Sequence, residues 1–276
     1  MLHALSTHLF VNHRLTTVLL DRIWEAGIPL VEIFCARQNL DYRDQAQIRE
    51  LGHWFRDAEL KIHSLHSPMY SDDCWGKTGP ASVVNICEPE KIRRKACVDE
   101  IKRAIEVSET IPFRYLIQHL GVGGEEYEDR KFEAAFSSLD ELNVFAEARG
   151  VEILLENIPN RLATAERLLD FLKLTHLQNG FCFDTGHAHL DRGIKESFRL
   201  MQDRIRSTHV HDNDHINDNH LFPFHSAAGT VDWKETMGLL KSRPDQYPLL
   251  LELREVPGME RQFDVVKQVI EQLESL

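Results

Sequence analysis

Carboxylates and histidines recur at the ends of short apolar runs in this chain. In the stretch GFCFDTGH, the apolar run 181–183 stops at Asp184, and His187 follows three residues later. Imidazole and carboxylate groups without thiolates suit Zn, Mn, Fe or Mg and can leave positions open for water or substrate. Five further runs end in the same way, at His66, His119, Glu156, His209 with His211, and Glu252. We therefore expect a catalytic metal site wherever the fold brings these ends together.

Each of these residues also has a structural explanation when it is considered alone. Asp184 could cap the helix that follows it, and Glu156 could pair with an arginine such as Arg161. Six consecutive runs that end in such groups by chance are much harder to explain, which favours metal binding. The other histidines are interpreted as packed or surface residues, namely His3, His8, His13, His53, His63, His176 and His189.

The runs themselves have the character of buried parallel strands. They are short, rich in Ile, Leu, Val and Phe, and often apolar on both faces. We predict strands at 2–10, 29–35, 61–67, 113–120, 151–157, 180–186, 205–212 and 248–254. Helical periodicity lies between them, most clearly at 88–109 with Pro89 near its start, at 129–150 with Gly150 as its C-terminal cap, and at 259–276.

Eight such units over 276 residues, about 34 residues each, predict one (β/α)8 barrel domain spanning 1–276. A doubly wound open sheet is the alternative. In a barrel the C-terminal ends of the strands meet at one rim, where this fold places its active sites. Two long loops, 67–86 and 213–231, are predicted to overhang that rim.

Composition narrows the classes of partner and the compartment. The chain has 32 basic and 44 acidic residues and a net charge of −12, which disfavours nucleic acid and anionic membranes as partners. No apolar run reaches the roughly 20 residues of a membrane span, and the N-terminus does not resemble a signal peptide. Five scattered cysteines without a C-x-x-C pair indicate reduced thiols, so we expect a cytoplasmic protein.

At these strand ends the sequence resembles the xylose-isomerase-like TIM barrels over nearly its whole length. That superfamily includes sugar isomerases, ketose 3-epimerases, inosose dehydratases and AP endonucleases of the endonuclease IV type. The resemblance rests on LHSP (65–68), QHLG (118–121), LLEN (154–157), FDTGH (183–187), HVHDND (209–214), DNHLFP (218–223), GTVDW (229–233) and LLLELRE (249–255).

The isomerase and epimerase members imply a divalent ion (Mn, Zn, Co or Mg) and a sugar or related small polyol as substrate. The implied ligands are Glu156, Asp184, His209 and Glu252. Glu156 and Glu252 would exchange a proton with the substrate carbon through an enediolate. The residues expected to contact substrate are His187, Asn157, His211 and Trp75.

The endonuclease members imply instead up to three ions and phosphodiester cleavage at abasic DNA. The additional ligands would be His66, His119, His187, Asp218 and His220. His225 could replace His220, because the 213–231 loop is longer than the family's compact turn. No basic or aromatic track suited to duplex DNA is evident, so this activity is the second interpretation. A metal-binding barrel without catalysis is the third, and a homo-oligomer is compatible with a family whose barrels are often paired.

Overall fold

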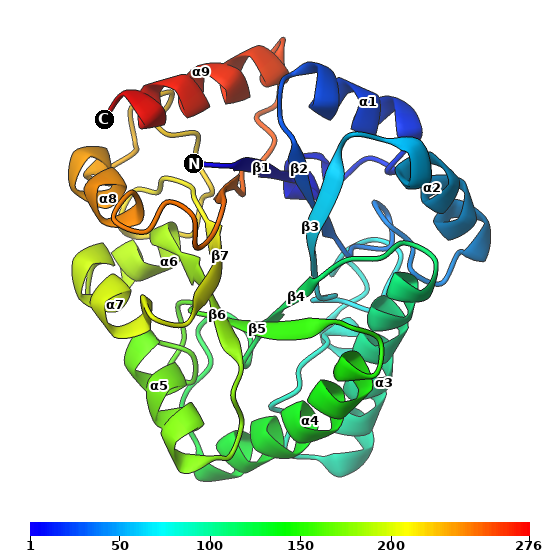
Figure 1. Cartoon of the computed structure of the whole chain (residues 1–276). Helices are drawn as coiled ribbons and strands as arrows, with labels where there is room; N and C mark the ends of the chain where they lie inside the picture. The colour runs from blue at the N-terminus through cyan, green and yellow to red at the C-terminus, as the bar shows by residue number, and fades with distance from the viewer.

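Eight parallel strands surround one axis in the computed structural model, which describes residues 1–276 (Figure 1). The strand order is β7-β6-β5-β4-β3-β2-β1-β8, without a reversal, and β1 pairs with both β2 and β8. The predicted (β/α)8 barrel is therefore confirmed, and the open-sheet alternative is wrong. The strands are β1 (His3–Ser6), β2 (Leu30–Phe34), β3 (Lys61–His66), β4 (Tyr115–His119), β5 (Glu152–Glu156), β6 (Gly180–Asp184), β7 (Ile205–His209) and β8 (Leu249–Leu251).

Helices pack around the outside of the barrel and alternate with the strands (Figure 1). The α-helices are α1 (Thr17–Glu25), α2 (Gln45–Asp57), α3 (Lys91–Glu106), α4 (Asp129–Glu147), α5 (Ala165–Leu174), α6 (Thr185–Leu190), α7 (Ile194–Met201), α8 (Trp233–Leu240) and α9 (Gln262–Ser275). Three short 3-10 turns are η1 (Thr7–Phe10), η2 (Pro80–Ser82) and η3 (Val107–Glu109).

Three local boundaries follow from side-chain chemistry. The first strand ends earlier than predicted, because the Ser6 hydroxyl accepts the backbone N–H of His8 and caps η1. Helix α3 begins at Lys91 rather than near Pro89, because the Glu90 carboxylate caps its first turn. Gly150 adopts a positive φ of 73° after α4, as predicted for a C-terminal cap.

The barrel closes between β7 and β8 through fewer backbone pairs than elsewhere. An isolated parallel bridge joins Val210 to Leu251. The Thr208 hydroxyl adds two contacts to this β7–β8 junction, or seam. It donates to the Pro248 carbonyl at 2.7 Å and accepts from the Leu250 N–H at 3.3 Å. The seam holds the ends of β7 and β8 together, and both of those ends carry predicted ligands.

Apolar side chains fill the barrel interior below the rim that carries the predicted ligands. Ile117, Leu154 and Cys182 each stand two residues before a predicted ligand and therefore share its face. They form a small buried cluster with Tyr115, which fills the barrel below the rim. A larger buried cluster packs the barrel against its helices. This apolar layer below the rim supports the rim side chains.

The two long loops carry structure of their own. In 67–86, Tyr70 and Val83 form a bridge, and the Asp72 carboxylate accepts the backbone N–H groups of Gly76 at 2.8 Å and Thr78 at 3.0 Å. In the loop after β7, Asp212 pairs with Leu221 in an antiparallel bridge. None of the helices combines the length and apolar character needed to cross a membrane.

Candidate metal centre

Four strand ends bring the first predicted ligand set together. Glu156 ends β5, Asp184 ends β6, His209 ends β7, and Glu252 directly follows β8. One ligand atom from each lies within 4.8 Å of the other three. The Nδ1 atom of His209 is 3.2 Å from Oε1 of Glu156, 3.2 Å from Oε2 of Glu252 and 3.8 Å from Oδ2 of Asp184. Parallel strands of one barrel make this convergence unavoidable.

Two buried polar atoms of this cluster lack hydrogen-bond partners, which fits a site for a divalent ion. Oε1 of Glu156 and Nδ1 of His209 are buried and have no hydrogen-bond partner, although only 3.2 Å separates them. Buried polar atoms are almost always satisfied, so an unpaired donor set aimed at one point is unusual. Three carboxylates and one imidazole are ligands that Zn, Mn, Co or Mg accept. These four residues could therefore hold an ion between them.

A fourth carboxylate, Glu32 on β2, orients His209 and was missed in the sequence. Its Oε2 atom lies 3.1 Å from Nε2 of His209 and accepts the Ser64 hydroxyl at 2.7 Å. A histidine whose far nitrogen donates to a carboxylate presents its near nitrogen to a metal without a proton. A lone glutamate inside the apolar run PLVEIFC was the only available signal for this role.

Two further groups of ligand-type side chains adjoin the first. His66 and His119 approach Glu156 from one side, with Nε2 atoms 3.5 Å and 3.0 Å from its Oε2 atom. In the second of these groups Asp218 lies 3.1 Å from His187 and 3.3 Å from His220. His211 completes this second group. All five additional residues named from the endonuclease resemblance therefore lie beside the first cluster.

Backbone carbonyls fix the orientation of three of the four additional histidines. Nδ1 of His66 lies 2.9 Å from the Ser67 carbonyl, and Nδ1 of His220 lies 3.0 Å from the Glu252 carbonyl. Nδ1 of His187 is likewise 3.0 Å from a backbone carbonyl. These contacts require a proton on Nδ1, so Nε2 is the nitrogen available to the cluster. This arrangement is typical of histidines that bind metals.

The electrostatics of the cluster show acids and imidazoles neutralising one another. Burial would lower the pKa of His209, but nearby Cys182 and several carboxylates hold it well above its usual value. Burial would raise the pKa of Glu156, but His209 and other imidazoles hold it well below its usual value. The carboxylate of Asp218 overcomes burial and raises the pKa of His220 to about 9. Divalent ions would take over the role of these protons.

The loop after β7 positions Asp218 and His220 through Asp212. The Asp212 carboxylate accepts the backbone N–H of Val231 at 3.1 Å and the indole N–H of Trp233 at 2.8 Å. His220 itself has a left-handed backbone with φ of 49°, a strained conformation that often accompanies function. His225 is exposed and belongs to none of the ligand groups, so Asp218 and His220 form the pair near the cluster.

A cavity of about 130 Å³ opens onto the cluster. Its volume is below the roughly 300–1,000 Å³ of typical small-molecule pockets, which favours a small substrate. Trp75 and Phe34 form an aromatic wall, with their rings 5.7 Å apart in an edge-on arrangement. The buried indole N–H of Trp75 has no partner, and the residue has a strained φ of 40°.

His8 also lines this cavity and was interpreted in the sequence as a packed residue. Its Nδ1 atom lies 3.0 Å from the Leu253 carbonyl, and its Nε2 atom has no protein partner. Burial, followed by the nearby imidazole of His220, lowers the pKa of His8 to about 3. His8 is therefore a neutral imidazole with a free acceptor nitrogen.

Two of the residues expected to contact substrate are occupied elsewhere. The Asn157 side chain donates to the Asp184 carbonyl at 2.9 Å and accepts the Asp184 N–H at 2.9 Å, so it joins β5 to β6. His211 is fully buried, lies 3.1 Å from the Asp184 carboxylate and does not line the cavity. Trp75 and His187 do line it.

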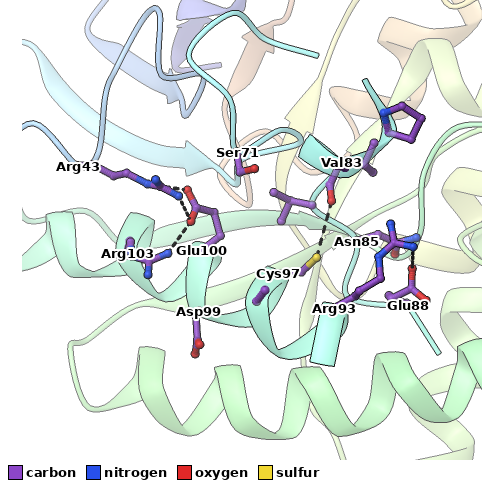
Figure 2. A pocket seen from close by; sticks show the side chains of 14 residues that line it. Arg43, Ser71, Val83, Asn85, Glu88, Arg93, Cys97, Asp99, Glu100 and Arg103 are labelled. Carbon is purple, nitrogen blue, oxygen red and sulfur yellow. Dashed lines mark hydrogen bonds and ion pairs between the residues drawn. The ribbon is translucent and has the colours of Figure 1, made fainter. Parts of the chain in front are cut away.

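A larger hollow of about 510 Å³ lies away from the cluster, between α3 and the 67–86 loop (Figure 2). Its arginines are already paired: Arg43 and Arg103 both contact Glu100, and Arg93 lies 3.8 Å from Glu88. No metal-type ligand group is found there. The chemistry of the molecule therefore lies at the barrel rim.

Comparison with known protein families agrees with this geometry. Residues 20–276 match the family model described as xylose isomerase-like TIM barrel. The chain belongs to this family. The resemblance noted in the sequence is thereby confirmed, and the matched residues include every candidate ligand at the rim.

Individual relatives are distant but extend over the barrel. An uncharacterised protein of Methanocaldococcus jannaschii is 27% identical over 282 residues, which cover 98% of this chain and 90% of that protein. A protein of Natronomonas pharaonis named "Probable endonuclease 4" is 26% identical over 148 residues, covering 50% of this chain and 52% of that protein. A crystal structure of a D-tagatose 3-epimerase-like protein superposes with a TM-score of 0.76 at 25% identity, covering 100% of this chain and 99% of that one.

Proposed function

We propose that this protein is a divalent-metal-dependent isomerase or epimerase acting on a sugar or related small polyol. The observation that carries the proposal is that carboxylate oxygens of Glu156 and Glu252 each lie 3.2 Å from the His209 Nδ1 atom. Membership of the xylose isomerase-like family and the likeness to an epimerase-like structure support a sugar isomerase or epimerase type of function. The small, polar-floored cavity is consistent with such a substrate.

Four residues would hold the principal ion, namely Glu156, Asp184, His209 and Glu252. A bound divalent ion would polarise the substrate carbonyl and acidify the neighbouring carbon-bound proton. Glu32 would keep His209 in the correct tautomer through its 3.1 Å contact. The remaining chemistry belongs to the side chains that surround the substrate carbon.

Glu156 and Glu252 would then remove and return the proton. They come from β5 and β8, which are well separated around the barrel, so they can address opposite faces of one carbon. A proton taken by one carboxylate and delivered by the other inverts that carbon, whereas delivery to the neighbouring carbon isomerises the sugar. His8 would accept a hydrogen bond from a substrate hydroxyl, while Trp75 and Phe34 would exclude water.

Phosphodiester cleavage at abasic DNA is the second candidate, because the donor set is larger than one ion needs. Glu156 is shared between the first ligand group and the group of His66 and His119, and a further group adjoins them around Asp218. This set could hold up to three ions. The relative named "Probable endonuclease 4", which matches over about half of each chain, favours the same activity, whereas the net charge of −12 opposes it.

One experiment separates the two candidates. Metal-free protein is reloaded with Mn, Co, Mg or Zn, the ions per chain are counted by elemental analysis, and each form is assayed with a panel of ketoses in deuterated water and with an abasic duplex. We expect deuterium uptake into a ketose, reduced at least about 100-fold in Glu156→Gln and Glu252→Gln. The exposed Glu133→Gln variant is the matched control. Duplex cleavage without uptake into any ketose would transfer the assignment to the second candidate.

A further inference from the structure

One cationic side chain faces the cavity and has no role in the metal centre. Arg254 follows Glu252 by two residues and is the only lysine or arginine that lines the cavity. Its backbone N–H donates to the His220 carbonyl at 3.0 Å. The segment after β8 is thus held against the segment that carries His220. Arg254 is exposed and lines the cavity, so it lies at the solvent-facing edge, or mouth, of the cavity.

The Arg254 guanidinium has no partner within the protein. No carboxylate lies within 4.0 Å of it, and it makes no hydrogen bond to another residue. The adjacent Glu255 pairs instead with His13, at 3.0 Å. The arginines of the outer hollow behave differently, since Arg43 and Arg103 are both bound to Glu100 (Figure 2). Acidic residues outnumber basic ones in this chain, 44 to 32, so carboxylates are not scarce.

The charges inside the cavity define what this guanidinium can bind. Glu156, Glu252 and Asp218 all line the cavity. Where bound ions do not neutralise their negative charges, these carboxylates would repel an anionic group from this part of the cavity. The same group would be attracted to the mouth, where Arg254 offers a planar pair of N–H donors suited to phosphate or carboxylate oxygens.

We propose that Arg254 binds an anionic substituent, a phosphate or a carboxylate, at the end of the substrate remote from the reacting carbon. The inference rests on the proposed function, since the same cavity must hold the substrate. It adds a substrate class, namely a phosphorylated sugar or sugar acid rather than a neutral sugar. It also adds an orientation, with the carbonyl end at the metal centre and the charged end at the mouth.

The test is equilibrium binding by calorimetry to metal-loaded protein, with three ligands of matched carbon number: D-ribulose, D-ribulose 5-phosphate and the pentulosonate in which C5 of ribulose is oxidised to a carboxylate. Wild-type protein should bind at least one of the two anions more tightly than D-ribulose. Which of the two anions binds more tightly identifies whether Arg254 recognises a phosphate or a carboxylate. Arg254→Gln should weaken that anion by roughly 10- to 100-fold without changing D-ribulose binding. The anion affinity of Arg254→Lys should lie between those of wild type and Arg254→Gln, because lysine keeps the positive charge but lacks the planar guanidinium.

The exposed Arg56→Gln, outside the cavity, is the control and should bind all three ligands as wild type does. The Arg254 side chain makes no contact that the fold needs, so its variants should load ions normally, which elemental analysis verifies. Equal affinity of wild type and Arg254→Gln for both anions would overturn the proposal, as would wild-type preference for D-ribulose. These readouts require no turnover, so an inactive ketose panel would count against the proposed function alone. An Arg254→Gln effect confined to an abasic duplex would overturn the small-molecule assignment.

Discussion

His209 and Glu32 are joined by a 3.1 Å contact between the imidazole Nε2 atom and a carboxylate oxygen, and both side chains are fully buried. The contact links the end of β7 to the middle of β2 across the barrel interior. It leaves Nδ1 of His209 directed at Glu156 and Glu252 without a hydrogen bond. The proposed first metal site would therefore depend on a residue that need not touch the ion.

Glu32→Gln should weaken ion binding while the barrel remains folded. The amide is nearly the same size but no longer selects the tautomer that presents a free Nδ1 atom. Loss of such an outer partner costs about 10- to 100-fold in metal affinity. Competition with a chromogenic chelator measures the affinity, and Glu133→Gln, at an exposed position, serves as the control. Wild-type affinity in Glu32→Gln would show that Glu32 does not orient His209.

His8→Phe should reduce catalytic efficiency without changing the number of bound ions. Phenylalanine keeps the ring packed against Phe34 and His220, which lie 5.0 Å and 4.7 Å away by ring centroids, but removes the free Nε2 acceptor. One neutral hydrogen bond corresponds to a loss of roughly 2- to 12-fold in kcat/KM. Steady-state kinetics and elemental analysis of the same preparation check both parts. A drop in ion content would instead make His8 part of the metal centre.

Gly186→Ala should disturb the group that contains His211. An added Cβ atom would lie 2.0 Å from the His211 ring, and that ring is held by the Asp184 carboxylate at 3.1 Å. We expect the free energy of unfolding to fall by roughly 1–3 kcal/mol, as for overpacked cores. Gly238→Ala in α8 is the control, since no atom lies within 4 Å of its added Cβ, and it should gain up to about 1 kcal/mol. Urea unfolding of both variants decides the comparison.

Ion binding should release protons at neutral pH. Carboxylates and, for His209, the nearby Cys182 outweigh burial and hold the pKa of His187 and His209 well above the ordinary value, so these imidazoles carry protons in the metal-free protein. An ion must displace them, and its affinity should therefore rise with pH. Calorimetry in buffers of different protonation enthalpy counts the protons, and we expect at least about one per ion at pH 7. Binding enthalpies independent of the buffer would contradict this account.

Metal-free protein should lose stability as pH rises from about 6.5 to about 9. Asp218 raises the pKa of His220 in the folded protein to about 9, whereas its pKa in the unfolded chain is near 6.5. The protonated imidazole therefore stabilises the fold fully below about pH 6.5. This stabilisation disappears as the pH passes through about 9. The contribution is at most about 3 kcal/mol. Melting curves across this range measure it, and Asp218→Asn should flatten the dependence. An equally steep decline in Asp218→Asn would place its origin elsewhere.

The sequence was informative wherever a side chain ended a strand. His66, His119, Glu156, Asp184 and His209 close β3 to β7 in order, and Glu252 follows β8. An apolar run followed by an acid or a histidine is visible in one dimension, and a parallel barrel brings all such endings to one rim. The loop residues Asp218 and His220 were named from a resemblance alone, because nothing in their spacing specifies the turn that directs them.

The residues that escaped prediction depend on the directions of side chains. Glu32 follows a register shift between Val31 and Glu32, and a bulge of this kind changes which way a side chain points. Its partner His209 lies 177 residues away, beyond the reach of any periodicity. Asn157 was expected at the substrate, but its amide closes on the Asp184 backbone, a contact that requires two neighbouring strands in register.

The sequence by itself therefore determined the barrel and the chemical types at its rim, because short apolar runs, the helical periodicity between them and polar strand endings are local properties of the chain. Only the tertiary structure decided which nitrogen of each histidine faces the cluster and which polar groups remain unpaired. It also decided which single arginine faces the cavity. The reason is physical: tautomers, unsatisfied atoms and cavity walls are set by partners that approach from different strands, and those distances exist only after the barrel has closed.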